Sequence, residues 1–93
     1  MLAARARHGL DWKLRLIFPS QIRAARALLG LNQETLAAGA GIGSATLKRI
    51  EATPQIRGAA DTLWKIEQTL EAAGIKFLSA EGQKGLGVRL RSR

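Results

Sequence analysis

Hydroxyl and basic side chains follow one another closely between residues 44 and 49, in the segment SATLKR. Arg49 could donate two hydrogen bonds to a guanine base, which gives roughly 1 to 3 kcal/mol of discrimination against other bases. A phosphate contact or a solvated arginine is the alternative for this side chain. Recognition of this kind requires a rigid element that presents the segment to a polyanion, so the surrounding sequence has to supply one.

Residue types that serve catalysis or metal binding do not form a set in this chain. His8 is the only histidine, and cysteine is absent. No paired carboxylates or activated nucleophile fall on a predicted face, and the stretch EGQKGLGV lacks the strand and helix that flank a phosphate-binding loop. We therefore expect a protein that is not an enzyme and that binds neither a metal nor a cofactor.

The basic charge is concentrated toward the two ends of the sequence. The net charge is +8, with a pI near 11.4. Residues 1–19 carry four basic and one acidic side chain, residues 20–73 six and five, and residues 74–93 five and one. Such an excess favours a polyanionic partner, nucleic acid before anionic lipid, although two solvated cationic tails would have the same composition.

The sequence favours a soluble cytoplasmic protein that does not enter a membrane. The longest apolar run near the start is Leu16-Ile17-Phe18, far shorter than a signal peptide or a membrane span requires. The absence of cysteine is consistent with a reducing compartment. At 93 residues and 46% hydrophobic residues, the chain is expected to form one small domain.

Apolar residues at helical spacing predict four helices, over residues 21–29, 33–38, 44–52 and 60–73. Ser20 is expected to cap the first helix and Asn32 the second, because both can accept a hydrogen bond from a free backbone N–H. Gly30 and Gly41 follow the first two helices, and each permits the left-handed conformation that ends a helix.

Alternating apolar and polar residues predict two short strands, over residues 75–77 and 88–91. An isolated hairpin is marginal in water, so the strands should pack on the helices or pair with strands of a second subunit. The second option predicts a homodimer. We divide the chain into a loosely ordered basic arm (1–19), a helical domain (20–73) and C-terminal strands that serve dimerisation (74–93).

Residues 33–52, QETLAAGAGIGSATLKRIEA, have the spacing of a helix-turn-helix. Ala37 is small where two helices would cross, and Gly41 permits a turn. Ile42, Leu47 and Ile50 would attach the second helix to the core. Such a second helix places its exposed N-terminal residues in the major groove of DNA.

The segment LGLNQETLAAGAGIGSATLKRIEA resembles the Cro/phage-repressor-like (XRE) helix-turn-helix family, over roughly residues 20–73. The resemblance implies a mainly α fold, a lambda-repressor-like helical bundle, here followed by a C-terminal β-hairpin or dimerising strands. It also implies an ion pair between Arg26 and Glu51. Double-stranded DNA is the implied partner.

The resemblance further implies which residues touch DNA. Gln33 would meet a phosphate at a helix N-terminus, with a simple cap residue as the less favoured alternative. Arg57 would contact the backbone from a loop, with a plain surface arginine as the alternative. The full expected DNA-binding set is Gln33, Gly43, Ser44, Ala45, Thr46, Lys48, Arg49 and Arg57.

The tip of the expected recognition helix departs from the common family pattern. Gly43 and Ser44 stand where many relatives have a serine followed by a longer polar or basic residue, so direct readout of bases should be sparse. Ala45 could still contact a thymine methyl group. We expect a sequence-specific transcriptional regulator, a dimeric repressor. The alternative is an antitoxin or another protein-interaction module, with a toxin or other protein as partner and weak or autoregulatory DNA binding.

Overall fold

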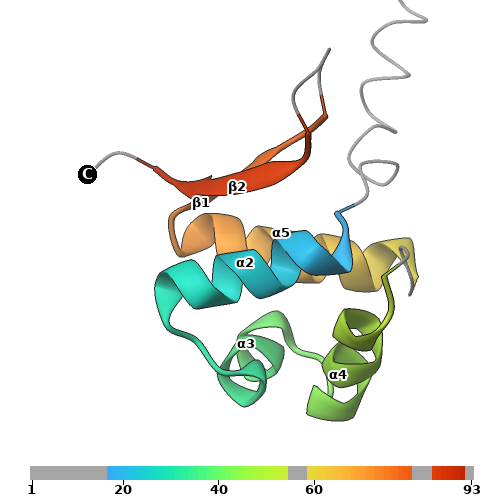
Figure 1. Cartoon of the computed structure of the whole chain (residues 1–93). Helices are drawn as coiled ribbons and strands as arrows, with labels where there is room; N and C mark the ends of the chain where they lie inside the picture. The colour runs from blue at the N-terminus through green and yellow to red at the C-terminus, as the bar shows by residue number, and fades with distance from the viewer. Residues whose placement is uncertain (1–16, 55–58, 81–84, 92–93) are drawn as a thin grey trace, which may run out of the picture.

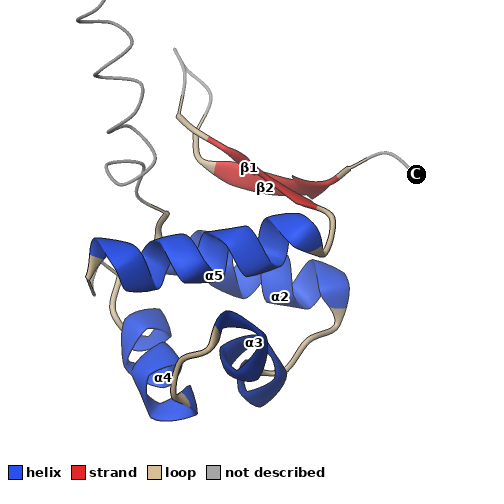
Figure 2. Ribbon diagram, turned by 180° about the vertical axis from the view of Figure 1, so that it is seen from behind, coloured by secondary structure: helices blue, strands red, loops and turns tan. Residues whose placement is uncertain are grey.

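The computed structural model describes residues 17–54, 59–80 and 85–91, and it contains four helices followed by a two-stranded antiparallel sheet (Figure 1). The elements are α2 (Pro19–Leu29), α3 (Gln33–Ala40), α4 (Ser44–Ala52), α5 (Ala60–Ala72), β1 (Ile75–Leu78) and β2 (Gly87–Leu90). Helices α2 and α5 form a middle layer, with α3 and α4 on one side and the hairpin on the other (Figures 1 and 2). The predicted fold class, a mainly α bundle with a C-terminal hairpin, is confirmed.

Helix α2 begins earlier than the sequence pattern predicts. Phe18 is the N-cap residue and Pro19 occupies the first turn, so the expectation that Ser20 caps this helix is wrong. The fixed φ of proline already suits a first helical position, and proline has no N–H that would need a partner there. Gln21 instead uses its Oε1 atom to accept the Phe18 N–H, at 2.9 Å.

Helix α3 begins as predicted and ends two residues later than predicted. The Asn32 side chain accepts the N–H of Thr35 at 2.7 Å, and the helix continues to Ala40 before Gly41 adopts a φ of +72°. Gly39 lies within the helix and close to α5: a Cβ atom on Gly39 would sit 3.2 Å from Cγ2 of Thr69. The absence of a side chain therefore allows the close approach of the two helices.

The core is continuous through all three layers. The largest fully buried apolar side chains are Ile22, Leu36, Leu47, Leu63, Ile66, Leu70 and Ile75. Three of them lie on α5, which packs against α3 on one side and β1 on the other. Ile17, which we placed in the arm, is also buried, so the folded part begins before residue 20. The rest of the predicted arm, up to residue 16, lies outside the described residues.

The two strands pair with each other and pack on the helices of their own chain. Ile75 is opposite Leu90, and Phe77 is opposite Val88. Ile75 and Phe77 are buried beneath the sheet, and β2 packs against α2. The hairpin therefore follows the first of the two arrangements that the sequence permits, with the inner face of β1 completing the core.

A single glutamine attaches the hairpin to α2. Gln21 is buried, and its Nε2 atom donates to the carbonyl oxygens of Leu78 at 3.1 Å and Gly87 at 3.0 Å. Leu78 is the last residue of β1 and Gly87 is the first residue of β2, and the two are paired. One amide group thus joins both strands to the first turn of the helix.

Replacing Gln21 with Leu should lower the free energy of unfolding by about 1 to 3 kcal/mol, because buried polar groups would lose their partners. Urea unfolding followed by circular dichroism measures the change. Gln68→Leu is the matched control, since Gln68 is exposed and makes only a 3.4 Å contact with Glu71. Equal losses in the two variants would show that Gln21 does not hold the hairpin.

Candidate nucleic-acid interface

Helices α3 and α4 form a helix-turn-helix joined by residues 41–43, on the side of the molecule away from the hairpin (Figure 1). Ala37 is buried where the sequence expects a small residue, and Leu47 and Ile50 are buried on the inner face of α4. Ile42 is half-buried against the same core. The packing fixes which face of α4 is left for a partner.

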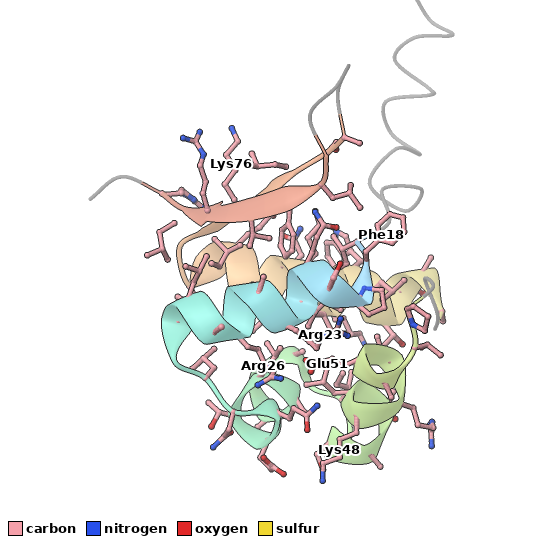
Figure 3. The ribbon with its side chains drawn as sticks, viewed as in Figure 1. Phe18, Arg23, Arg26, Lys48, Glu51 and Lys76 are labelled. Carbon is pink, nitrogen blue, oxygen red and sulfur yellow. The ribbon has the colours of Figure 1, made fainter. Side chains whose placement is uncertain are left out.

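The outer face of α4 carries four exposed residues at helical spacing, Ala45, Lys48, Arg49 and Ala52. Ser44 and Thr46 are half-buried. Lys48 points away from the body of the protein (Figure 3), and its Nζ atom lies 3.7 Å from Oε2 of Glu34. Both side chains of this pair are more than half exposed, so the ion pair contributes only about 0 to 1 kcal/mol to stability.

The structure brings Arg26 and Glu51 together in a bidentate ion pair (Figure 3). The two contacts measure 2.8 Å from Nε to Oε2 and 2.7 Å from NH2 to Oε1. Arg26 also donates to the carbonyl oxygen of Leu31 at 3.0 Å. The hydrogen bonds to Glu51 raise the pKa of the Arg26 guanidinium, against a smaller opposing effect of burial. The guanidinium therefore keeps its positive charge at neutral pH.

Gln33 belongs to the same network. Its Nε2 atom donates to Oε1 of Glu51 at 3.0 Å, so the side chain is turned toward the ion pair. Gln33 is also the first residue of α3, where backbone N–H groups are free to bind an anion. This position joins the start of α3 to the end of α4.

Arg23 is a residue of this region that the sequence reasoning missed. Its guanidinium donates to the backbone carbonyl of Glu51 near the end of α4. Arg23, Arg26, Gln33 and Lys48 are among the residues that line an open groove of about 450 Å³ beside the start of α3. The sequence does contain a signal that could have identified Arg23: it lies three residues before Arg26, so the two are neighbours on the surface of α2.

Of the remaining residues that the sequence singled out, the structure describes only Gly43. Gly43 is the exposed N-cap residue of α4. Arg57 lies outside the described residues, as do His8 and Trp12. Within residues 17–54, 59–80 and 85–91, no group of His, Cys, Asp and Glu side chains is arranged to hold a metal ion. No helix in these segments is both long enough and apolar enough to cross a membrane.

Replacing Glu51 with Ala should lower the free energy of unfolding by about 3 kcal/mol, the lower end of the range for breaking a buried pair, because Arg26 remains partly exposed. Urea unfolding of Glu51→Ala, Arg26→Met and the double variant forms a thermodynamic cycle. The double variant should lose less stability than the two single losses added together. Simple additivity would mean that the two charges are not coupled.

Comparison with known protein families supports the helix-turn-helix geometry of α3 and α4. The pattern that defines the Helix-turn-helix family matches residues 22–73, more than half of the chain. No curated protein sequence matches the chain. The matched region starts within α2 and ends just after α5, so it includes the whole of α3 and α4 and excludes the hairpin. The chain belongs to the Cro/phage-repressor-like (XRE) helix-turn-helix family and is a DNA-binding regulator of that type.

Proposed function

We propose that the protein is a sequence-specific transcriptional repressor that binds double-stranded DNA as a homodimer in the cytoplasm. The observation that carries this proposal is the outer face of α4, where Ala45, Lys48 and Arg49 are exposed together on a helix held by buried residues on its other side. A helix presented in this way fits the major groove.

The exposed face suggests a division of roles along α4. Arg49 is assigned to a base edge, since it is exposed and its side chain forms no hydrogen bond or ion pair with another described residue. Ala45 is assigned to a thymine methyl group, and Lys48 to a base or a phosphate. Ser44 and Thr46, with half-buried side chains, are assigned to the rim of the groove, and the backbone at Gly43 to close approach of the DNA.

Phosphate contacts are assigned to the start of α3. Gln33 would offer its backbone N–H and its second amide hydrogen there, while its first amide hydrogen stays on Glu51. Arg23 and Lys48 flank the same groove and add positive charge. Arg57 keeps its proposed role as a backbone contact from the loop that precedes α5.

Dimerisation is assigned to the C-terminal strands. Among the described residues, β2 pairs with β1 and has no other strand beside it. Leu86 and Leu90 are among the three large apolar side chains of the described chain that are exposed, at 41% and 37%. Dimers of helix-turn-helix proteins bind two half-sites about one helical turn, roughly 34 Å, apart, so a second copy paired along this edge would have to present its α4 at that spacing.

An antitoxin is the second candidate function, and one surface feature favours it. The ends of α2, α5 and β2 enclose a hollow of about 370 Å³, lined in part by Leu29, Ala72, Ala73 and Leu90. A side chain of a partner protein could occupy this hollow. In an antitoxin this hollow would hold a partner protein, whereas the repressor proposal requires no such partner. Both candidates retain the DNA-binding helix-turn-helix.

Arg49→Ala should lower affinity for the selected operator by roughly 5- to 150-fold, the equivalent of 1 to 3 kcal/mol, and relax the preference at one base position. The operator is first selected from a randomised duplex library at two salt concentrations. Arg23→Ala should weaken binding to all sequences about equally, and Lys65→Ala, an exposed lysine on α5, should change little. Identical effects of the Arg49 and Arg23 variants on every sequence would contradict the assigned roles.

Leu90→Glu should convert the dimer to a monomer, because two carboxylates would be brought into the apolar part of the interface. Sedimentation velocity gives the mass of each variant. Leu28→Glu is the control, because Leu28 is also exposed but lies on α2 rather than on a strand. If Leu90→Glu leaves the mass unchanged, the dimer interface does not include this part of β2.

A further inference from the structure

The outer face of the hairpin carries two cations side by side. Lys76 on β1 is paired directly with Arg89 on β2, and both are exposed. Their neighbours Ile75 and Phe77 are buried beneath the sheet, so residues that alternate with them face outward. Figure 3 shows Lys76 directed away from the helices. The outward positions of this sheet thus present a pair of positive charges to solvent.

No described residue neutralises this pair. Neither Lys76 nor Arg89 forms an ion pair or a side-chain hydrogen bond with another part of the described chain. The described residues of the hairpin, 75–80 and 85–91, contain no Asp or Glu. Arg91 differs, because its guanidinium donates to the carbonyl oxygen of Glu71 and so binds the end of α5.

Two like charges directly opposite each other in an antiparallel pair weaken a sheet. This hairpin has only two strands of four residues each, and a hairpin of that size is only marginally stable by itself. The arrangement therefore disfavours folding, and an anion that bridges the two side chains would remove the repulsion. A DNA backbone supplies negative charges at the required density.

The middle of the molecule separates this surface from the helix-turn-helix. Helix α5 carries Asp61, Glu67 and Glu71 against the single cation Lys65. Lys48 and Lys76 point in opposite directions on either side of the α2 and α5 layer (Figure 3). A helix with its side chains is about 10 to 12 Å across, so a straight duplex held by α4 does not reach the hairpin.

We propose that the outer face of the hairpin, centred on Lys76 and Arg89, binds the phosphate backbone of a second DNA segment while α4 holds the first. The contact is independent of sequence, because it involves only two cations and phosphates. One molecule would then bring two duplex segments together. This role adds to the recognition of an operator and does not require the strands to form a dimer interface.

The test is a nuclear magnetic resonance titration of the ¹⁵N-labelled full chain with a short duplex of unrelated sequence at low salt. Amide signals of α3 and α4 should shift first, and those of Lys76 and Arg89 should shift when duplex is in excess. Lys76→Gln combined with Arg89→Gln should abolish the second phase and reduce the slope of log K against log salt by roughly 0.9 for each lost phosphate contact.

Three matched variants isolate the charges. Lys76→Arg combined with Arg89→Lys keeps both cations and should keep the second phase. Lys65→Gln removes one exposed cation from α5 and should also keep it. Arg49→Ala should weaken the first phase alone, so a failure of the operator proposal is distinguishable from a failure of this one. The double Gln variant should have an unchanged or higher melting temperature, which excludes unfolding as the cause of any loss.

Two results would overturn the proposal. The first is a second phase that survives in the double Gln variant, because the DNA would then bind elsewhere. The second is an oligoglutamate peptide that shifts Lys76 and Arg89 at concentrations at which duplex DNA does not, because the surface would then serve an acidic protein.

Discussion

The bidentate contact between Arg26 and Glu51 sets the position of the recognition helix. Both carboxylate oxygens of Glu51 are engaged by Arg26, and one also accepts from Gln33 at the start of α3. A planar guanidinium on a carboxylate has a narrow range of orientations, so α4 is fixed relative to both α2 and α3. Such a pair adds little stability over apolar packing, but breaking it leaves a buried charge. Its main effect is on geometry, and the outer face of α4 depends on that geometry.

Helix α2 links this network to the hairpin on the other side of the molecule. Gln21 binds the strands, and Arg26 binds the helix-turn-helix. Arg26 is five positions after Gln21 in the sequence, which places the two side chains about 140° apart around an α-helix. The two polar contacts therefore act on nearly opposite faces of one element, while Ile22 and Ala25 fill the core between them. A change in the tilt of α2 would disturb both surfaces together.

The local features of the fold were predictable because their causes are local. Asn32 and Gly41 act through backbone groups within a few residues, and the sequence shows such signals directly. Gln21 could not be assigned from sequence, because its partners lie 57 and 66 residues away. The burial of Glu67 was also not predicted, although its position four residues after Leu63 places it on the buried face of α5. Residues close in the sequence determine where a helix ends. The polar contacts that orient one helix relative to another depend instead on how distant parts of the chain pack together.

The basic surfaces differ in what each can contribute to DNA binding. The tip of α4 offers Gly43, Ser44 and Ala45, which have short side chains or none, so Arg49 would carry most of the direct readout in the proposed complex. One bidentate contact discriminates between bases but gives limited affinity. Affinity that is independent of sequence comes from phosphate contacts, which release counterions. Because α5 carries most of the acidic residues of the described chain, the cations are displaced from the centre toward the groove beside α3 and toward the hairpin. The fold thereby separates the residue that would read sequence from most of those that would supply attraction to the backbone.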